Sequence, residues 1–311
     1  MQFRHPRAVV LLFIGIIVVM QAAFWLLPRH PFSENEKRVL AEAPQINAAG
    51  IADGSVFRSI ESYLSDHFPG RNLWVGANAC LERAEGRGAT EDIVCGTDGW
   101  LFTAPVSEDR ETLWDNMQAI TTFAERQSVP VTMMAVPSAG AVVSDKLPAL
   151  HLPYPDADML EEARRIAGNT LHWVDLYTDF CSAEQPERLY YRTDHHWTTE
   201  GAYRAYCLLM DKLGQPSVPR DDFTVEQIAD FYGTSYSRSG LWLTEPDTIE
   251  LWTDSDIQAV TTVYDANRAD PVTREGMFFR EYLEDADKYP VFLGGNHARV
   301  HIETNADSGK R

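Results

Sequence analysis

The feature that most constrains this chain is an apolar run of twenty residues near its N-terminus, Ala8 to Leu27. Its only strongly polar member is Gln21, and at about 1.5 Å per residue a helix of this length covers the roughly 30 Å hydrocarbon core of a bilayer. Arg4 and Arg7 precede the run, which favours a cytoplasmic N-terminus. A cleaved signal peptide is the alternative, but the run is long and no clean Ala-x-Ala site follows it. We therefore expect a single-pass, membrane-anchored protein with an extracytoplasmic body.

The rest of the chain has the composition of a globular body. The whole chain of 311 residues is 44% hydrophobic and 11% aromatic, enough for one large core besides the anchor. We expect a cytoplasmic tip and transmembrane signal anchor over residues 1–28, a tether over 29–50 and the body over 51–311. The formal charge of −19 repels nucleic-acid phosphates, so we do not expect a nucleic-acid partner.

The cysteines give little information about cofactors. Cys80, Cys95, Cys181 and Cys207 are compatible with two disulfides or with four thiols. None of them forms a C-x-x-C pair, so a structural zinc site is not expected. We predict neither a metal nor a cofactor.

Strand and helix patterns alternate along the body. Leu113–Gln127 and Leu160–Ala167 have the three-and-four apolar spacing of helices. Val129–Val136 is a nearly continuous apolar run, which predicts a strand buried on both faces of a parallel sheet, and Thr170–Leu176 resembles a second strand. This alternation predicts an α/β fold. Val129–Val136 is followed by a turn of small residues that includes Ser138, and such turns line active sites at the carboxyl ends of strands.

Chemically versatile residues concentrate between Tyr190 and Gly201, where the sequence is Tyr-Tyr-Arg-Thr-Asp-His-His-Trp-Thr-Thr-Glu-Gly. Histidine moves protons near neutral pH, and a nearby carboxylate can orient its ring and stabilise its cation. Asp194 could instead cap the helix that the following residues predict, and the histidines and Trp197 could be packing residues. The local pattern supports capping and chemistry about equally.

The expected side-chain directions distinguish members of this stretch. In an extended segment, alternate side chains share a face. One face then carries Arg192, Asp194 and His196. The other face carries Thr193, His195 and Trp197. This arrangement favours a structural role for His195, while Arg192 either anchors a substrate anion or pairs with Asp194.

The same stretch carries a family resemblance. Asp-x-His-Trp followed by Thr-x-x-Gly-Ala resembles the signature of SGNH-like membrane-anchored acyltransferases, which include alginate O-acetyltransferases, and Asp-His-His-Trp resembles the bacterial DHHW proteins. Phe-Ser-x-x-Glu at Phe32 and the Gly-x-Asp-Gly-Trp-Leu-Phe hairpin at residues 96–102 resemble the same relatives. The resemblance implies an SGNH-hydrolase-like sheet with flanking helices. It also implies a Ser-His-Asp triad in which Asp194 is the carboxylate and His196 the base.

A later glycine pair is a candidate for oxyanion or substrate binding. Residues 292–296 read Phe-Leu-Gly-Gly-Asn, and similar segments occur in DHHW proteins. Backbone N–H groups near Gly295 and the amide of Asn296 could approach a developing oxyanion. From the residues alone, a plain turn with glycine at positive φ is the more favoured interpretation.

The nucleophile is the uncertain member of the triad. The resemblance implies a serine on an Asp-Ser-Tyr turn after a further apolar strand, whereas the sequence stops at Arg311, and Asp307-Ser308 is not a convincing replacement. The preferred hypothesis is a chain incomplete at the C-terminus of this domain. Alternatively, Ser138 or Ser235 acts as a stand-in serine. A third hypothesis is a non-catalytic glycan-binding or scaffold protein of the envelope.

For function, the resemblance implies serine acyl transfer in the cell envelope. The partners would be an acyl donor and a polysaccharide hydroxyl, or water in an esterase, with no cofactor. Metal-dependent phosphoester hydrolysis is the rival, because Asp-His-His also occurs in the DHH phosphoesterases. Those enzymes need further aspartates in an early Asp-x-Asp setting, which is absent here, and Asp175 and Asp179 are weak substitutes.

Overall fold

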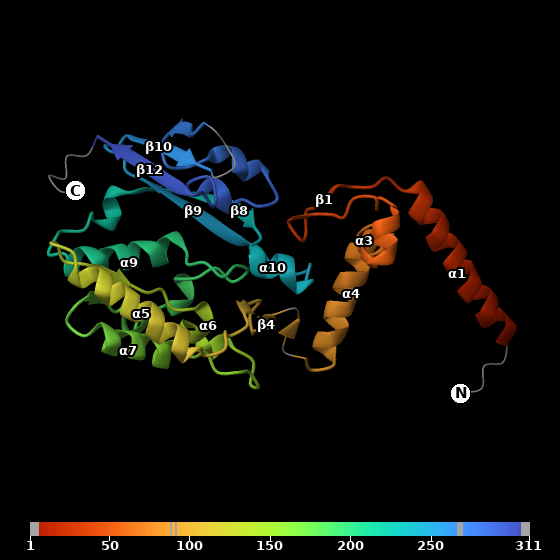
Figure 1. Ribbon diagram of the computed structural model, residues 1–311, viewed down its shortest axis with the longest axis horizontal. Coiled ribbons are helices and arrows are strands. Elements are labelled where there is room, and N and C mark those ends of the chain that lie inside the picture. The colour runs from red at the N-terminus through yellow and green to blue at the C-terminus, as the bar shows by residue number, and fades with distance from the viewer. Residues whose placement is uncertain (1–5, 88, 91, 266–269, 306–311) are drawn as a thin grey trace. The chain divides into compact units, whose positions relative to one another are not determined.

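The computed structural model describes residues 6–87, 89–90, 92–265 and 270–305 (Figure 1). The chain divides into two compact units, residues 1–81 and 82–311, and each is described by itself. The predicted domain limits at residues 28 and 50 stay predictions. Asp307 and Ser308 lie outside the described residues.

The first unit begins with helix α1 (Pro6–Leu26), which contains nearly all of the predicted apolar run. Among the described helices, Arg7–Leu26 is the only segment long and apolar enough to cross a membrane. The unit continues with β1 (Phe32–Ser33), β2 (Arg38–Val39), α2 (Ala48–Ala52), α3 (Ser55–Asp66) and α4 (Arg71–Ala84), the last of which runs on into the second unit.

The expected tether has structure of its own. Strands β1 and β2 pair antiparallel, and Arg38 in β2 donates to Asp66 in α3 at 2.5 Å. This hydrogen bond lowers the pKa of Asp66 to about 2, although burial opposes the shift. Arg71 pairs with Glu36 in the same way. These ion pairs fasten the tether to the helices that follow it.

The second unit mixes short strands and helices. In chain order its elements, with η marking 3₁₀ helices, are β3 (Ala89–Thr90), β4 (Ile93–Cys95), β5 (Leu101–Thr103), α5 (Arg110–Glu125), β6 (Thr132–Met134), α6 (Ala139–Val142), η1 (Ser144–Lys146), α7 (Asp156–Ala167), β7 (His172–Val174), α8 (Leu176–Cys181), η2 (Pro186–Arg188), α9 (Thr199–Lys212), η3 (Arg220–Asp222), β8 (Thr224–Phe231), α10 (Thr234–Ser239), β9 (Asp247–Thr253), β10 (Ala259–Tyr264), β11 (Val272–Glu275), η4 (Arg280–Glu284), η5 (Tyr289–Val291) and β12 (Arg299–Thr304). The predicted α/β class is confirmed.

The predicted parallel pairing is present, but one strand differs from expectation. Strands β6 and β7 pair in parallel, and α5 and α7 lie side by side (Figure 1). The prediction that Val129–Val136 is a strand buried on both faces is wrong. Only Thr132–Met134 is strand, and Val129 and Val136 are 64% and 48% exposed. Val129 and Val136 lie beyond the ends of β6, whereas Met133 and Met134 within it are partly buried against two different clusters of core residues.

Antiparallel pairs make up the remaining sheets. Strands β4 and β5 form the predicted hairpin, with β3 on the other side of β4, and its turn places Asp98 and Gly99 at positive φ. Strand β8 pairs with β9. Strand β10 lies between β11 and β12. The segment after β11 is irregular before the short 3₁₀ helix η4.

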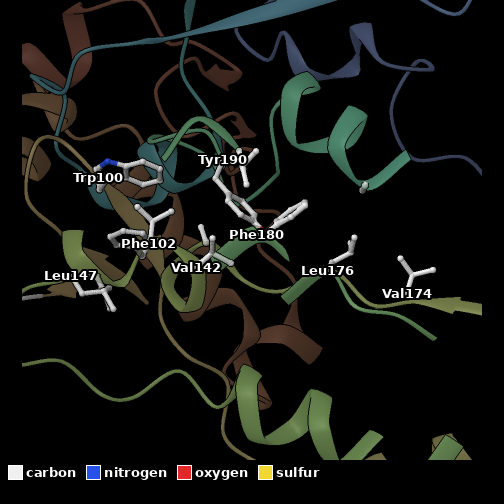
Figure 2. Packing of buried hydrophobic residues seen from close by; sticks show 13 residues of the cluster. Trp100, Phe102, Val142, Leu147, Val174, Leu176, Phe180 and Tyr190 are labelled. Atoms are coloured by element: carbon white, nitrogen blue, oxygen red, sulfur yellow. The ribbon is translucent and has the colours of Figure 1, made fainter. Parts of the chain in front are cut away.

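The main hydrophobic core holds the start of the Asp-His-His-Trp stretch. Figure 2 shows side chains from the β4–β5 hairpin, α6, β7, α8 and the segment before α9 packed together. Trp100 and Phe102 stack with ring centroids 5.3 Å apart. Tyr190 is buried in this cluster, and its hydroxyl donates to the carbonyl of Pro137 at 2.6 Å. Tyr190 therefore fixes the backbone where the Asp-His-His-Trp stretch begins.

Candidate active site

The Asp-His-His-Trp stretch is bent rather than extended. It lies between two residues that form an isolated bridge, Tyr190 and Trp197. The predicted alternation of faces is wrong: Thr193 and Asp194 are both buried, at 0% and 2% exposure. The physical reason is an Asx-type turn, in which the Asp194 carboxylate accepts the backbone N–H of His196 at 2.9 Å and reverses the chain.

Asp194 and His196 form a close pair. Nδ1 of His196 lies 2.5 Å from Oδ1 of Asp194, and Oδ2 accepts the backbone N–H of Thr234, at the start of α10, at 2.6 Å. Burial by itself raises the pKa of Asp194. The hydrogen bond and charge of His196 and the two backbone donors outweigh it and hold that pKa well below its usual range. An ionised carboxylate that accepts from Nδ1 leaves Nε2 of His196 as the proton acceptor.

Two aromatic rings contact His196. Tyr289 in η5 stacks on it, with ring centroids 4.0 Å apart and planes 13° apart. Burial, with a contribution from the charge of Asp194, raises the pKa of Tyr289 to about 12, so its phenol is protonated at neutral pH. Sequence reasoning did not identify Tyr289, although it lies just before the glycine pair.

The second ring in contact with His196 is that of His195, and the centroids of the two imidazole rings are 4.0 Å apart. Its Nδ1 is 3.7 Å from Asp194 Oδ1, beyond hydrogen-bond distance. Burial lowers the pKa of His195, which outweighs the opposing effect of Asp194, so its ring is neutral at neutral pH. His195 therefore lies beside His196 without forming a hydrogen bond to the Asp194 carboxylate.

Arg192 pairs with a carboxylate other than Asp194. Its Nε lies 3.4 Å from Oδ1 of Asp247, and its guanidinium donates to the carbonyl of Pro246 at 3.0 Å. Arg192 does not line the cavity beside His196. Its geometry therefore supports neither of the two roles considered for it, pairing with Asp194 or anchoring a substrate anion.

A cavity of about 710 Å³ opens beside the pair. The polar side chains of its wall include His195, His196, Ser138, Ser235, Asp156 and Arg238, and much of the remaining wall is apolar. The hydroxyls of Ser138 and Ser235 are both buried, and neither has a hydrogen-bond partner within the described part of the chain. Ser138 precedes α6, and its backbone N–H donates to Asp156 at 2.6 Å. Both stand-in serines therefore share one cavity with His196.

The glycine pair lies apart from this cavity. Gly294 and Gly295 have φ of 82° and 97°, and their N–H groups donate to the carbonyls of Pro290 and Phe292 at 2.9 and 3.4 Å. Neither Gly295 nor Asn296 is part of the cavity wall. This geometry is that of a tight turn, and the oxyanion role stays a prediction.

A metal site at the motif would compete with these hydrogen bonds. Possible ligand atoms of Asp194, His195 and His196 lie within 4.8 Å of one another. However, Nδ1 of His196 and both oxygens of Asp194 already take part in the contacts described above. Asp175 caps α8 and Asp179 pairs with Arg204, so neither adds a carboxylate here. The residues therefore suit a hydrogen-bonded acid–base pair better than a metal site.

Comparison with known proteins shows what the second unit is similar to. The model of the family described as "SGNH hydrolase-like domain, acetyltransferase AlgX" matches residues 93–242. Residues 93–242 therefore resemble an SGNH hydrolase-like domain of the AlgX type. This confirms the predicted family resemblance, and the matched range contains the hairpin, the Asp194–His196 pair and both stand-in serines.

Curated proteins similar to this chain carry the name probable alginate O-acetylase AlgJ. The protein of Pseudomonas aeruginosa is 26% identical over 180 residues, which cover 52% of this chain and 44% of the relative. That of Pseudomonas syringae pv. tomato is 27% identical over 208 residues, covering 61% and 48%. The chain thus spans about half the length of the curated relatives it matches.

Solved structures share the fold. A DHHW family protein from Eubacterium siraeum superposes with a TM-score of 0.55 at 24% identity, covering 71% of this chain and 74% of that one. PatB1 of Bacillus cereus gives a TM-score of 0.56 at 18% identity, covering 68% and 75%. At these identities the likeness shows a shared fold and nothing finer.

Proposed function

We propose that this chain is the SGNH-like part of a cell-envelope O-acyltransferase that modifies a polysaccharide by serine chemistry. The observation that carries the proposal is the 2.5 Å contact between His196 Nδ1 and the buried Asp194, in the wall of a cavity large enough for a sugar and an acyl group. The AlgX-type domain and the alginate O-acetylase relatives support the same chemistry.

In the proposed mechanism, His196 Nε2 takes the proton of a serine hydroxyl as the serine oxygen attacks the acyl carbonyl. The donor's leaving group departs with that proton, and an acyl-serine remains. His196 then takes a proton from a sugar hydroxyl, whose oxygen attacks the acyl-serine, and returns it to the serine. Asp194 stays ionised, holds the imidazole in one tautomer and stabilises its cation. With water in place of the sugar, the same steps make an esterase.

The body acts outside the cytoplasm in this proposal, held at the membrane by α1. The apolar helix Arg7–Leu26 supports this location, and the similarity to probable alginate O-acetylases is consistent with it. A polysaccharide is the acceptor, and the donor carries an activated acyl group. The proposed reaction between this donor and this acceptor uses no cofactor.

The test is release of acetate from an activated ester such as p-nitrophenyl acetate. We expect His196→Ala to lower kcat by about 10²- to 10⁴-fold, the usual contribution of a general base. His172→Ala is the matched control, because His172 is exposed on β7 and lies outside the cavity wall. Equal activity of His196→Ala and the parent chain would remove the role given to His196.

A sulfonyl fluoride probe followed by peptide mapping identifies the serine. Labelling of Ser235 or Ser138 assigns the nucleophile within this sequence, and the corresponding alanine variant should lose both label and activity. Activity and labelling only in a chain extended by the coding sequence beyond codon 311 would assign it to a later segment. Stoichiometric transition metal in the purified protein would instead favour phosphoester hydrolysis, and glycan affinity without any activity would favour a binding protein.

A further inference from the structure

A second carboxylate, largely shielded from solvent, holds the two residues that precede Asp194. Oδ2 of Asp247, at the start of β9, accepts both the N–H and the hydroxyl of Thr193 at 2.7 Å. Oδ1 accepts the N–H of Arg192 at 3.2 Å and its Nε at 3.4 Å. One carboxylate that is 9% exposed therefore takes four donors and fixes the backbone directly before the pair.

Thr193 connects Asp247 to Gly233, which lies beside the Asp194 side chain. Its hydroxyl donates to Asp247 and accepts the N–H of Gly233 at 3.0 Å. The next residue, Thr234, donates its N–H to Asp194. Gly233 packs directly against Asp194, because a Cβ on Gly233 would overlap the Asp194 side chain. The carboxylate thus lies between two segments that Thr193 joins.

We propose that Asp247 is the positioning residue of the pair: through Thr193 and Gly233 it places the Asp194 carboxylate where it orients the His196 ring. The proposal rests on the proposed function, since Asp247 acts only through Asp194 and His196. Asp247 is absent from the cavity wall, so it does not act by contacting substrate. A misplacement of roughly 1 Å in a reacting group costs on the order of 10²-fold in rate, which sets the expected effect.

The kinetics of three variants of Asp247 and Thr193 test the proposed positioning role. Asp247→Asn replaces one accepting oxygen by a donor, and Thr193→Val removes the hydroxyl while keeping the shape. We expect each to lower kcat by about 10²-fold with little change in KM. Thr193→Ser keeps the hydroxyl and should restore most of kcat.

Glu250→Gln is the matched control for these variants. Glu250 lies on the same strand, but its carboxylate accepts from Gln227 and Trp252 rather than from the motif. We expect its kcat and KM to match those of the parent chain. If Asp247→Asn fails to fold, the comparison of Thr193→Val with Thr193→Ser decides the matter.

The Nδ1–H resonance of His196, observed by ¹⁵N-edited NMR, is a readout that does not need turnover. A strong hydrogen bond to Asp194 shifts this proton far downfield, and we expect the signal to move upfield or disappear in Asp247→Asn and Thr193→Val. It should persist in Thr193→Ser and Glu250→Gln. An unchanged resonance together with unchanged kcat in Asp247→Asn would overturn the positioning role. A responsive resonance with no effect of His196→Ala on turnover would instead overturn only the proposed function.

Discussion

At the scale of single residues, the site depends on how one carboxylate is held. Asp194 is buried and accepts hydrogen bonds from the ring and backbone of His196 and from the backbone of Thr234. These donors favour the ionised form more than burial disfavours it, and the pKa is lowered as a result. A carboxylate that stays ionised in an enclosed place is what a general base needs beside it.

This lowered pKa has a consequence for stability in acid. An unfolded aspartate titrates near about 3.9, above its value in the folded chain, so the unfolded state binds more protons as the pH falls. The stabilisation from Asp194 is therefore present above about pH 4 and is lost as the pH falls towards the folded-state pKa. We expect the Tm advantage of the parent chain over Asp194→Asn to shrink in this range.

Thermal unfolding followed by circular dichroism between about pH 6 and pH 2 measures this difference. Asp145→Asn is the control for removal of a carboxylate, because Asp145 is exposed and has no role in the site. A Tm difference between the parent chain and Asp194→Asn that does not depend on pH would contradict the expectation.

At the scale of elements, the start of α9 explains the spacing Thr-x-x-Gly in the motif. The hydroxyl of Thr198 accepts the N–H of Gly201 at 3.1 Å and donates to the carbonyl of Arg188 at 2.7 Å. A Cβ on Gly201 would overlap the carbonyl of Leu189, so glycine lets the helix begin against the preceding segment. Threonine caps the helix, and glycine makes room for it.

Loss of this cap should destabilise the second unit. We expect Thr198→Ala to lower the free energy of unfolding by about 1 kcal/mol, the usual cost of removing a threonine N-cap. Urea unfolding measures it, and Thr198→Ser, which keeps the hydroxyl, should remain close to the parent chain. Equal stability of the alanine and serine variants would show that the hydroxyl contributes nothing.

At the scale of the whole molecule, α1 is the basis of the proposed membrane location. We expect the expressed chain to stay in the membrane pellet after alkaline carbonate extraction, because a helix of twenty apolar residues spans the hydrocarbon core. Intact mass or N-terminal sequencing of the extracted protein is the second measurement. A soluble product that lacks α1 would show that the helix is a cleaved signal peptide.

Much of this architecture could be predicted because it depends on neighbours in the chain. Apolar runs and three-and-four spacing predicted α1, α5 and α7 to within a few residues. The turn residues Asp98 and Gly99 predicted the hairpin, since their positive φ is a local property. Asp194 and His196 could be singled out for the same reason, being two residues apart.

Only the tertiary structure decided how that pair is held. Tyr289, Asp247, Gly233 and Thr234 reach it from segments distant in sequence, and no periodicity or spacing marks such contacts. The bend that brings His195 beside His196 arises from hydrogen bonds that an alternating pattern does not encode. Short-range patterns determine helices, turns and a candidate pair in advance, whereas the environment of a buried charge depends on long-range packing that exists only once the chain has folded.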